Sequence, residues 1–210
     1  MSGDAYILDV CQGAKSTGCR NALPLPSHFV AELQSMLGCA PCPEAYSALG
    51  RPLLHHERFR LALSACPNGC SRPHVADLGI IACSEIEVLR HLCSGCGACV
   101  GKCPDGAIAL AGNVAVVDFR RCLGCGKCIS ACKNKAISPC GQSCRIVLGG
   151  RLGRHPRLGR ELHKRLDSAS VSTLTRRCLG VYQQYMLPGK RFSDILFPQN
   201  LPGFPAWVFS

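Results

Sequence analysis

Residues 58–82 read RFRLALSACPNGCSRPHVADLGIIA, and they join two apolar segments through a turn that carries two cysteines. RFRLALSA (58–65) alternates polar and apolar residues at its start, and DLGIIA (77–82) contains β-branched residues, so both segments are predicted to be strands. Between them, Cys66 and Cys70 flank Pro-Asn-Gly, a sequence typical of a tight turn. The prediction of the fold depends on this order of strand, Cys-x3-Cys turn and strand.

The chain of 210 residues contains 18 cysteines, and their role depends on whether the protein is in a reducing or an oxidising compartment. The N-terminal sequence MSGDAYILDVCQG has no basic region followed by an apolar one, and no apolar run approaches the roughly 18 residues that span a bilayer. We therefore expect a cytoplasmic protein without a membrane span. Because the cytoplasm is reducing, clustered cysteines there are more often metal ligands than disulfides.

The formal net charge of +11 is concentrated toward the C-terminal end, where residues 145–191 hold 11 basic and two acidic residues. Aromatic residues are few and are not interleaved with these bases, as a platform for stacking single-stranded nucleic acid would require. We therefore expect no nucleic-acid partner. The charge is interpreted as a basic wall around an anionic cofactor and an anionic substrate.

Further strands and helices are predicted on both sides of the opening stretch. YILDV (6–10) and RIVLGG (145–150) are predicted strands, and HFVAELQSML (28–37) has apolar residues at helical spacing. A basic helix is predicted from about Leu158 to Leu166. The tail from Pro188 has no clear periodicity and is expected to wrap over the surface. Together these elements predict an α+β fold.

Residues 89–138 form a cysteine-rich block with an internal repeat. CSGCGACVGKCPDGAI (93–108) and CLGCGKCISACKNKAI (122–137) align without gaps at a period of 29 residues, and each contains Cys-x2-Cys-x2-Cys-x3-Cys. Each copy ends in an Ala-Ile pair that is expected to begin, or to pack under, a short helix. The block resembles bacterial two-cluster ferredoxins, although proline follows the last cysteine of the first copy only.

In such ferredoxins three cysteines of one loop hold three corners of a [4Fe-4S] cluster, and the fourth ligates the cluster of the other repeat. The first cluster is therefore predicted to bind Cys93, Cys96, Cys99 and Cys132, and the second to bind Cys122, Cys125, Cys128 and Cys103. Eight ligands at this spacing argue against a zinc site. Because one predicted strand enters the block and another leaves it, residues 89–138 are interpreted as an insertion into a host domain formed by 1–88 and 139–210.

The host segments resemble the sulfite and nitrite reductase family. The resemblance is carried by CPNGCSRP (66–73), VCQGAKSTGCRNAL (10–23) and GGRLGRHPRLG (149–159). It implies an α/β sandwich and a third [4Fe-4S] cluster bound by Cys11, Cys19, Cys66 and Cys70, with the Cys70 thiolate also bridging to the iron of sirohaem. The inserted ferredoxin domain makes the chain similar to the dissimilatory branch of that family, in which such an insertion is found.

Two departures from the family pattern are visible. Seven residues separate Cys11 from Cys19, where the family usually has five. The chain is also only about half as long as a full sulfite reductase, whose two related halves jointly enclose the sirohaem. A second half would then come from a second copy of this chain or from another subunit, or it would be dispensable.

The resemblance also implies fixed cations, because sirohaem carries many carboxylates and sulfite is an anion. The candidates for the cofactor carboxylates are Arg72, Arg151, Arg154 and Arg157, and those for the substrate oxygens are Lys15 and Arg20. Protons would come from lysine, arginine-bound water or histidine, and His74 and His155 lie in the matching segments. For each of these residues, a solvated surface charge is the alternative interpretation.

Six cysteines remain outside these three sets. Cys39 and Cys42 either replace members of the Cys11–Cys19 pair or bind nothing, and we favour the latter. Cys140 and Cys144 form a second Cys-x3-Cys that would suit an additional metal site. Cys83 and Cys178 stand alone and are expected to be small buried apolar residues.

The leading hypothesis is an iron–sulfur oxidoreductase that passes electrons from the ferredoxin clusters to a [4Fe-4S]–sirohaem centre and reduces sulfite or nitrite. The sequence does not separate these two anions. The alternative is a cluster-only electron-transfer or accessory subunit without sirohaem and catalysis, which the half-length chain and the altered first spacing favour. The expected partners are an electron-donor protein and a homodimer mate or second subunit.

Overall fold

The chain is described here by a computed structural model that covers residues 5–15, 18–47 and 49–196. Its centre is a five-stranded sheet in the order β1-β2-β3-β6-β7. The strands are β1 (Tyr6–Val10), β2 (Phe59–Ser64), β3 (Leu78–Val88), β6 (Ile137–Leu148) and β7 (Arg160–Glu161). β1, β2 and β3 run parallel, whereas β6 is antiparallel to both β3 and β7. Mixed strands and helices confirm the predicted α+β class.

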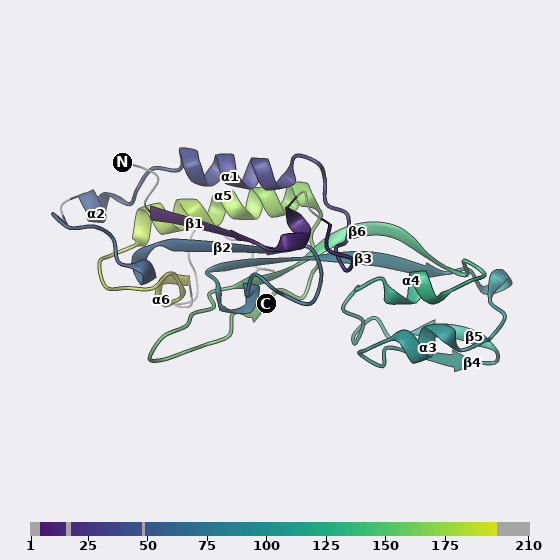
Figure 1. Cartoon of the computed structure of the whole chain (residues 1–210). Helices are drawn as coiled ribbons and strands as arrows, with labels where there is room; N and C mark the ends of the chain where they lie inside the picture. Colours follow the sequence, from purple (N-terminus) through teal and green to yellow (C-terminus); the bar gives the residue numbers. More distant parts are fainter. Residues whose placement is uncertain (1–4, 16–17, 48, 197–210) are drawn as a thin grey trace.

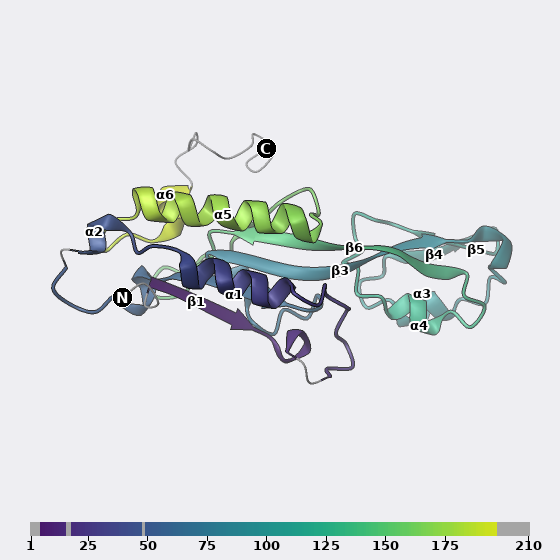
Figure 2. The same cartoon turned by 90° about the horizontal axis from the view of Figure 1, so that it is seen from above.

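Two helices, α1 (Phe29–Cys39) and α5 (Ser168–Tyr185), lie on one face of this sheet (Figures 1 and 2). Phe59, Leu61 and Leu63 of β2 are fully buried in the core that these helices cover. Side chains alternate along a strand, so Arg60 points to the opposite face. Each large apolar side chain buried in this core contributes roughly 1.5–3 kcal/mol to folding. None of the helices in the described ranges is both long and apolar enough to cross a bilayer.

Strands β3 and β6 continue beyond the sheet as a two-stranded antiparallel ribbon. Their pairing runs from Leu78 opposite Leu148 to Val88 opposite Ile137, with one irregularity between Glu85 and Ile86. The ribbon carries a small unit at its far end (Figures 1 and 2). The unit contains β4 (Ile108–Ala111), β5 (Val114–Val117), α3 (Ala98–Lys102) and α4 (Lys127–Ala131).

The small unit has an apolar cluster of its own, separate from the host core. Ile108, Ala115 and Cys128 pack there against Ile86 of β3 and Ile137 of β6. The predicted domain boundaries, after residue 88 and before residue 139, therefore fall at the ends of two strands that contribute to both clusters. The division into host and inserted domain stays a prediction.

The remaining elements are short. They are the helices α2 (Glu44–Ser47) and α6 (Phe192–Leu196) and the 3-10 turns Gln12–Ala14, His55–Glu57, Pro73–Val75 and Arg90–Leu92. The first predicted helix and the strands of the host are present, and β3 and β6 extend much further than expected.

Two expectations from the sequence were wrong, and a third held in one of its two forms. The segment predicted as a basic helix from Leu158 to Leu166 instead pairs with β6, because Arg160 and Glu161 form β7 and Leu166 bridges to Cys144. The isoleucine of each Ala-Ile pair begins a strand, β4 or β6, and not a helix, but it packs in one cluster with Cys99 of α3 and Cys128 of α4. The tail beyond Pro188 does not only cover the surface, because Phe192 and Leu196 are buried in the host core; residues 197–210 lie outside the described part.

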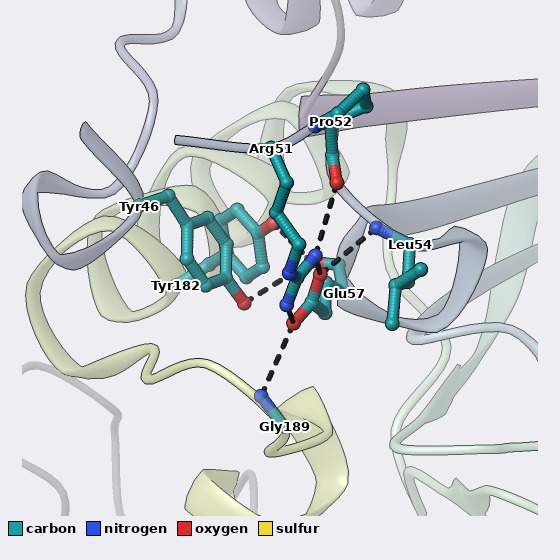
Figure 3. Close-up of polar contacts among 7 residues, drawn as sticks. All are labelled: Tyr46, Arg51, Pro52, Leu54, Glu57, Tyr182 and Gly189. Carbon is teal, nitrogen blue, oxygen red and sulfur yellow. Dashed lines mark hydrogen bonds and ion pairs between the residues drawn. The ribbon is translucent and has the colours of Figure 1, made fainter. Parts of the chain in front are cut away.

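A buried carboxylate ties the segment before β2 to the segment after α5 (Figure 3). The side chain of Glu57 is fully buried and accepts two hydrogen bonds of 2.8 Å from Arg51. It also accepts hydrogen bonds from the amides of Leu54 (2.8 Å) and Gly189 (3.2 Å). Arg51 and these amides lower the pKa of Glu57 to about 2. The hydroxyls of Tyr46 and Tyr182 donate to the Glu57 backbone carbonyl, at 3.3 Å and 2.5 Å.

Candidate metal centres and anion-binding cavities

Four cysteines of the host gather where β1 and β2 end. Because the two strands are parallel, their carboxyl ends meet at one edge of the sheet, and Cys11 and Cys66 follow them. The Cys11 amide donates to the Leu63 carbonyl at 3.0 Å, and the Ala65 amide donates to Cys11 Sγ at 3.2 Å. Burial raises the pKa of the Cys66 thiol, and the nearby charges of the Cys11, Cys70 and Cys19 thiolates raise it further.

The loop that carries Cys19 folds back onto the same edge. The Ala22 amide donates to the Cys19 carbonyl at 2.9 Å, and the Leu23 amide donates to the Ala65 carbonyl at 2.8 Å. Packing inside the loop is tight, because a Cβ added at Gly13 would lie 2.9 Å from the Ala22 Cβ and 3.2 Å from the Cys19 Cβ. The long spacing between the first two cysteines is therefore compatible with a place for Cys19 near Cys66.

A cavity of about 730 Å³ opens beside these thiols. Residues that line it include Cys11, Lys15, Arg60, Cys70 and Arg72, so both cysteine motifs and several cations share one wall. Arg72 is exposed and has a left-handed backbone (φ 57°), a conformation that is costly for a residue with a side chain. Arg20 is exposed in the turn after Cys19 and does not line this cavity.

A second cavity, of about 220 Å³, shares Arg60 with the first. Its lining includes Arg58, Asp77, Arg151 and Arg191. Burial raises the pKa of Asp77 to about 7, although the Arg60 amide and the charges of Arg191 and Arg60 oppose that shift. The Asp77 carboxyl group can therefore hold or release a proton near neutral pH.

The Gly-Arg segment 149–159 is only partly placed as expected. Arg151 lines the second cavity, but its Nη1 is paired with Asp194 at 2.7 Å and its Nε donates to the His155 carbonyl. Arg154 and Arg157 are not among the described residues that line either cavity. His74 packs beside the Cys70 loop, because a Cβ at Gly69 would lie 3.7 Å from its Cε1, whereas His155 is exposed.

Sequence reasoning missed Arg58, Arg60, Asp77 and Arg191. A signal for the first two was present, because the alternation in RFRLALSA sets Arg58 and Arg60 on the face opposite Phe59 and Leu61. Asp77 and Arg191 had no such signal, because only the folded chain brings them to the same cavity.

In the small unit, the first predicted set of ligands surrounds one cavity. Cys93, Cys96, Cys99 and Cys132 all line a cavity of about 290 Å³. Within the described ranges, no group of three or more His, Cys, Asp or Glu residues is placed to hold a single metal ion. The four thiols therefore surround a volume and do not converge on one point. Cys96 is exposed, and the Ala98 amide is the main cause that lowers its pKa.

Three members of the second predicted set, Cys122, Cys125 and Cys128, lie close together in their own repeat. Burial raises the pKa of the Cys128 thiol to about 11, with further contributions from the charges of Cys122 and Cys125. The fourth member, Cys103, accepts a hydrogen bond at its Sγ from the Ala107 amide (3.3 Å), and the equivalent Cys132 accepts one from Ala136 (3.2 Å).

The glycines between the ligands also match between the repeats. Gly95 and Gly97 in the first repeat, like Gly124 and Gly126 in the second, have positive φ angles between 68° and 73°. The period of 29 residues is therefore a structural repeat as well as a sequence repeat.

The other six cysteines belong to none of these three groups. Cys39 is exposed, and Cys42 packs against the host core. Cys140 is exposed whereas Cys144 is buried in that core, so the two are not placed to share the additional metal site that their spacing suggested. Cys83 and Cys178 are buried, as expected.

Comparison with known proteins gives one family match and several relatives. The family described as the nitrite and sulphite reductase 4Fe-4S domain matches residues 51–197. The coenzyme F420-dependent sulfite reductase of Methanocaldococcus jannaschii is 39% identical over 128 residues, which are 61% of this chain and 20% of the relative. One subunit of the anaerobic sulfite reductase of Salmonella typhimurium is 37% identical over 116 residues, 54% of this chain and 34% of the relative.

The chain thus spans a fifth and a third of the length of these two curated relatives. Among solved structures, the crystal structure of dissimilatory sulfite reductase I aligns with a TM-score of 0.58 at 15% sequence identity. The alignment covers 91% of this chain and 49% of that one. At this identity the likeness concerns the fold alone.

Proposed function

This chain belongs to the nitrite and sulphite reductase 4Fe-4S domain family, and we propose that it holds three [4Fe-4S] clusters and a sirohaem and reduces sulfite or nitrite. The family match already identifies the chain as a sulfite-reductase-like iron–sulfur protein. The proposal concerns the finer points: the number of clusters, the sirohaem and the anion that is reduced.

The observation that carries the proposal is the meeting of two cysteine motifs beside a cationic cavity. Cys11, Cys19, Cys66 and Cys70 are grouped at one edge of the sheet, and Cys11 and Cys70 also line the cavity of about 730 Å³. Soft thiolate donors suit iron–sulfur clusters. We assign these four residues to a host cluster, with Cys70 as the thiolate on the cavity side. The residues present fit both a cluster and a neighbouring anionic cofactor.

The cations around the two cavities fit a cofactor with several carboxylates. Arg60 faces both cavities, Arg72 lines the larger one, and Arg58 and Arg191 line the smaller one. A planar guanidinium pairs well with a carboxylate. We therefore assign the sirohaem carboxylates to Arg72 and to Arg58 and Arg191 of the second cavity. Arg60 and Arg151 contribute less, because Asp9 and Asp194 already engage them.

The substrate side of the larger cavity is assigned to Lys15. Lys15 is exposed and lines the cavity together with Cys70, so its ammonium group can attract and orient a small anion there. Arg20 has no place in this lining and is assigned to the surface. Asp77, whose carboxyl group titrates near neutral pH, and His74, beside the Cys70 loop, are the groups proposed to hold protons for the reaction.

When bound, the clusters supply single electrons and sirohaem supplies the iron at which the anion is reduced. The chain itself sets the order of the sites. A Cβ at Gly126 would lie 3.4 Å from Leu23 Cδ2, and the Leu23 amide bonds to Ala65, the residue before Cys66. The Cys122 set is therefore the proximal one. The Cys93 set is the distal one, and an electron-donor protein is proposed to dock on its side.

The alternative is a cluster-only accessory subunit. It is favoured by one observation: this chain aligns with about half of the solved sulfite reductase. On that alternative, the cations of the cavities would face a second copy or another subunit.

Anaerobic purification from cells that make ample sirohaem separates the two functions. We expect a Soret-type absorption band, iron for three clusters, and oxidation of the reduced protein by sulfite or nitrite. A protein with three clusters and no Soret-type band would contradict the reductase and leave the accessory subunit. Cys70→Ser is expected to abolish the coupling between haem and cluster, whereas Cys140→Ser, at an exposed cysteine outside the three groups, is the matched control.

A further inference from the structure

One host side chain reaches the loop that carries the proximal ligands. Nη2 of Arg165 donates a hydrogen bond to the carbonyl oxygen of Cys122, which lies 43 residues earlier in the chain. The backbone next to Arg165 is held firmly, because Leu166 and Cys144 exchange two hydrogen bonds of 2.7 Å and 2.9 Å. The guanidinium is therefore fixed by the host sheet and directed at the small unit.

The same loop is pressed against the host at Gly124. The Ser84 amide of β3 donates to the Gly124 carbonyl at 2.8 Å. A Cβ at Gly124 would lie 2.9 Å from the Cys83 Cβ and 3.3 Å from Nη1 of Arg165, and its φ of +71° also favours glycine. The Cys122 loop thus lies between β3 and the Arg165 side chain, and there is no room for a side chain at position 124.

The charge of Arg165 is well placed to act on a cluster. Arg165 is only partly exposed, and within the described part of the chain it has no salt bridge. Reduction adds one negative charge to a cluster, so a fixed cation nearby stabilises the reduced form. Lys133, which lines the distal cavity, is exposed, so water and salt screen its charge more strongly, although it still contributes to lowering the pKa of Cys96.

We propose that Arg165 is a positioning residue for the proximal cluster. Its hydrogen bond fixes the Cys122 loop against the host, and its charge raises the reduction potential of that cluster relative to the distal one. Electrons that arrive at the distal cluster then gain free energy as they move toward the host. The inference rests on the proposed ligation of a cluster by the Cys122 set.

The test is an anaerobic redox titration of the full-length protein followed by electron paramagnetic resonance. In Arg165→Gln, we expect the reduced-to-oxidised ratio of the proximal cluster to fall about tenfold at a fixed potential, a shift of about 59 mV for one electron. Arg165→Lys keeps the charge and should restore most of the potential. Lys164→Gln removes the same charge from an exposed neighbouring position and should change nothing.

The distal cluster in the same sample is the internal control for folding. The shifted signal is assigned by repeating the titration in a Cys96→Ser background, in which only the distal signal should change. Equal shifts in Arg165→Gln and Lys164→Gln, equal shifts of both clusters, or no shift in a normally loaded Arg165→Gln would overturn the inference alone. A wild-type protein that lacks any signal dependent on the Cys122 set would instead overturn the proposed ligation, and the inference with it.

Discussion

Replacing Glu57 by alanine should be among the most destabilising changes outside the proposed metal centres. The carboxylate is fully buried and accepts four hydrogen bonds: two from Arg51 and one each from the Leu54 and Gly189 amides. Removing it leaves two backbone N–H groups and a guanidinium without their acceptor. We expect the free energy of unfolding to fall by roughly 3–5 kcal/mol.

The shifted pKa leads to a similar magnitude by a separate route. The pKa of Glu57 is about 2 in the folded protein, against the ordinary value of 4.5. A depressed carboxylate pKa stabilises the folded state fully above 4.5, and this stabilisation is lost as the pH falls through about 2. At 1.36 kcal/mol per pKa unit, the contribution at neutral pH is about 3 kcal/mol.

Chemical denaturation at neutral pH, followed by far-ultraviolet circular dichroism, measures the loss. Glu32→Ala is the matched control, because Glu32 also pairs with an arginine, Arg176 at 3.6 Å, but both side chains are exposed. An exposed pair of this kind should cost less than about 1 kcal/mol. Equal losses in the two variants would refute the argument from burial. So would a Glu57→Ala protein whose stability still falls between pH 4.5 and 2 as steeply as that of the wild type.

Three further predictions concern the sheet and the repeat. Gly79→Ala should destabilise the host by more than about 3 kcal/mol and lower the iron content of the host cluster, because a Cβ there would lie 2.2 Å from the Pro73 carbonyl oxygen. The folded pKa of Asp77, about 7, exceeds the ordinary 3.8, so the stability of the wild type should fall as the pH rises between these values. Asp77→Asn should remove this pH dependence, and unfolding midpoints measured at pH 4 and pH 7 check it. Lys135 has a left-handed backbone (φ 54°), and the equivalent residue of the first repeat, Gly106, has φ 57°. Because glycine adopts this conformation without strain, Lys135→Gly should leave the unfolding midpoint unchanged or raise the stability by up to about 1 kcal/mol. A clear loss of stability would show that the left-handed backbone of Lys135 carries no strain.

The repeat was the part of the chain that could be predicted most fully from sequence. Thiol spacing and positive-φ glycines are local properties, so the pattern of Cys93 and Cys122 with their neighbours already described each loop. The crossed arrangement, in which Cys132 lines the cavity of the first repeat, follows from the ferredoxin resemblance and agrees with the lining of that cavity. Ligation of the clusters stays a proposal.

The helix α5 and the segment before it show where local reasoning fails. Leu158–Leu166 has basic residues at helical spacing, but Gly159 lies so close to β6 that a Cβ would come within 2.6 Å of Val147 Cγ1, and pairing with β6 takes precedence. α5 is rich in serine and threonine, which have modest helix propensity. Packing of Leu174, Cys178 and Tyr182 on the sheet stabilises it, and that packing is a tertiary effect.

The residues of the candidate anion sites could be predicted only where they lie near a cysteine motif in the sequence. Lys15, Cys70 and Arg72 adjoin the cysteine motifs in sequence and share one cavity. The second cavity is built from segments before β2, after β6 and after α5, so Arg191 could not be assigned to it before the fold was known.

The ribbon of β3 and β6 has a consequence for how such a chain is assembled. The small unit occupies the position of the turn in an antiparallel hairpin, since Val88 and Ile137 are opposite each other where it begins and ends. An antiparallel pair of strands needs only a two-residue turn to close it. Adding or removing the unit at this point therefore leaves the pairing of β3 with β6 intact, and changes only the contacts to the unit itself, such as the bonds from Ser84 and Arg165 to the Cys122 loop. A host sheet with a plain turn and one that carries an electron-transfer module would then be alternative forms of a single scaffold.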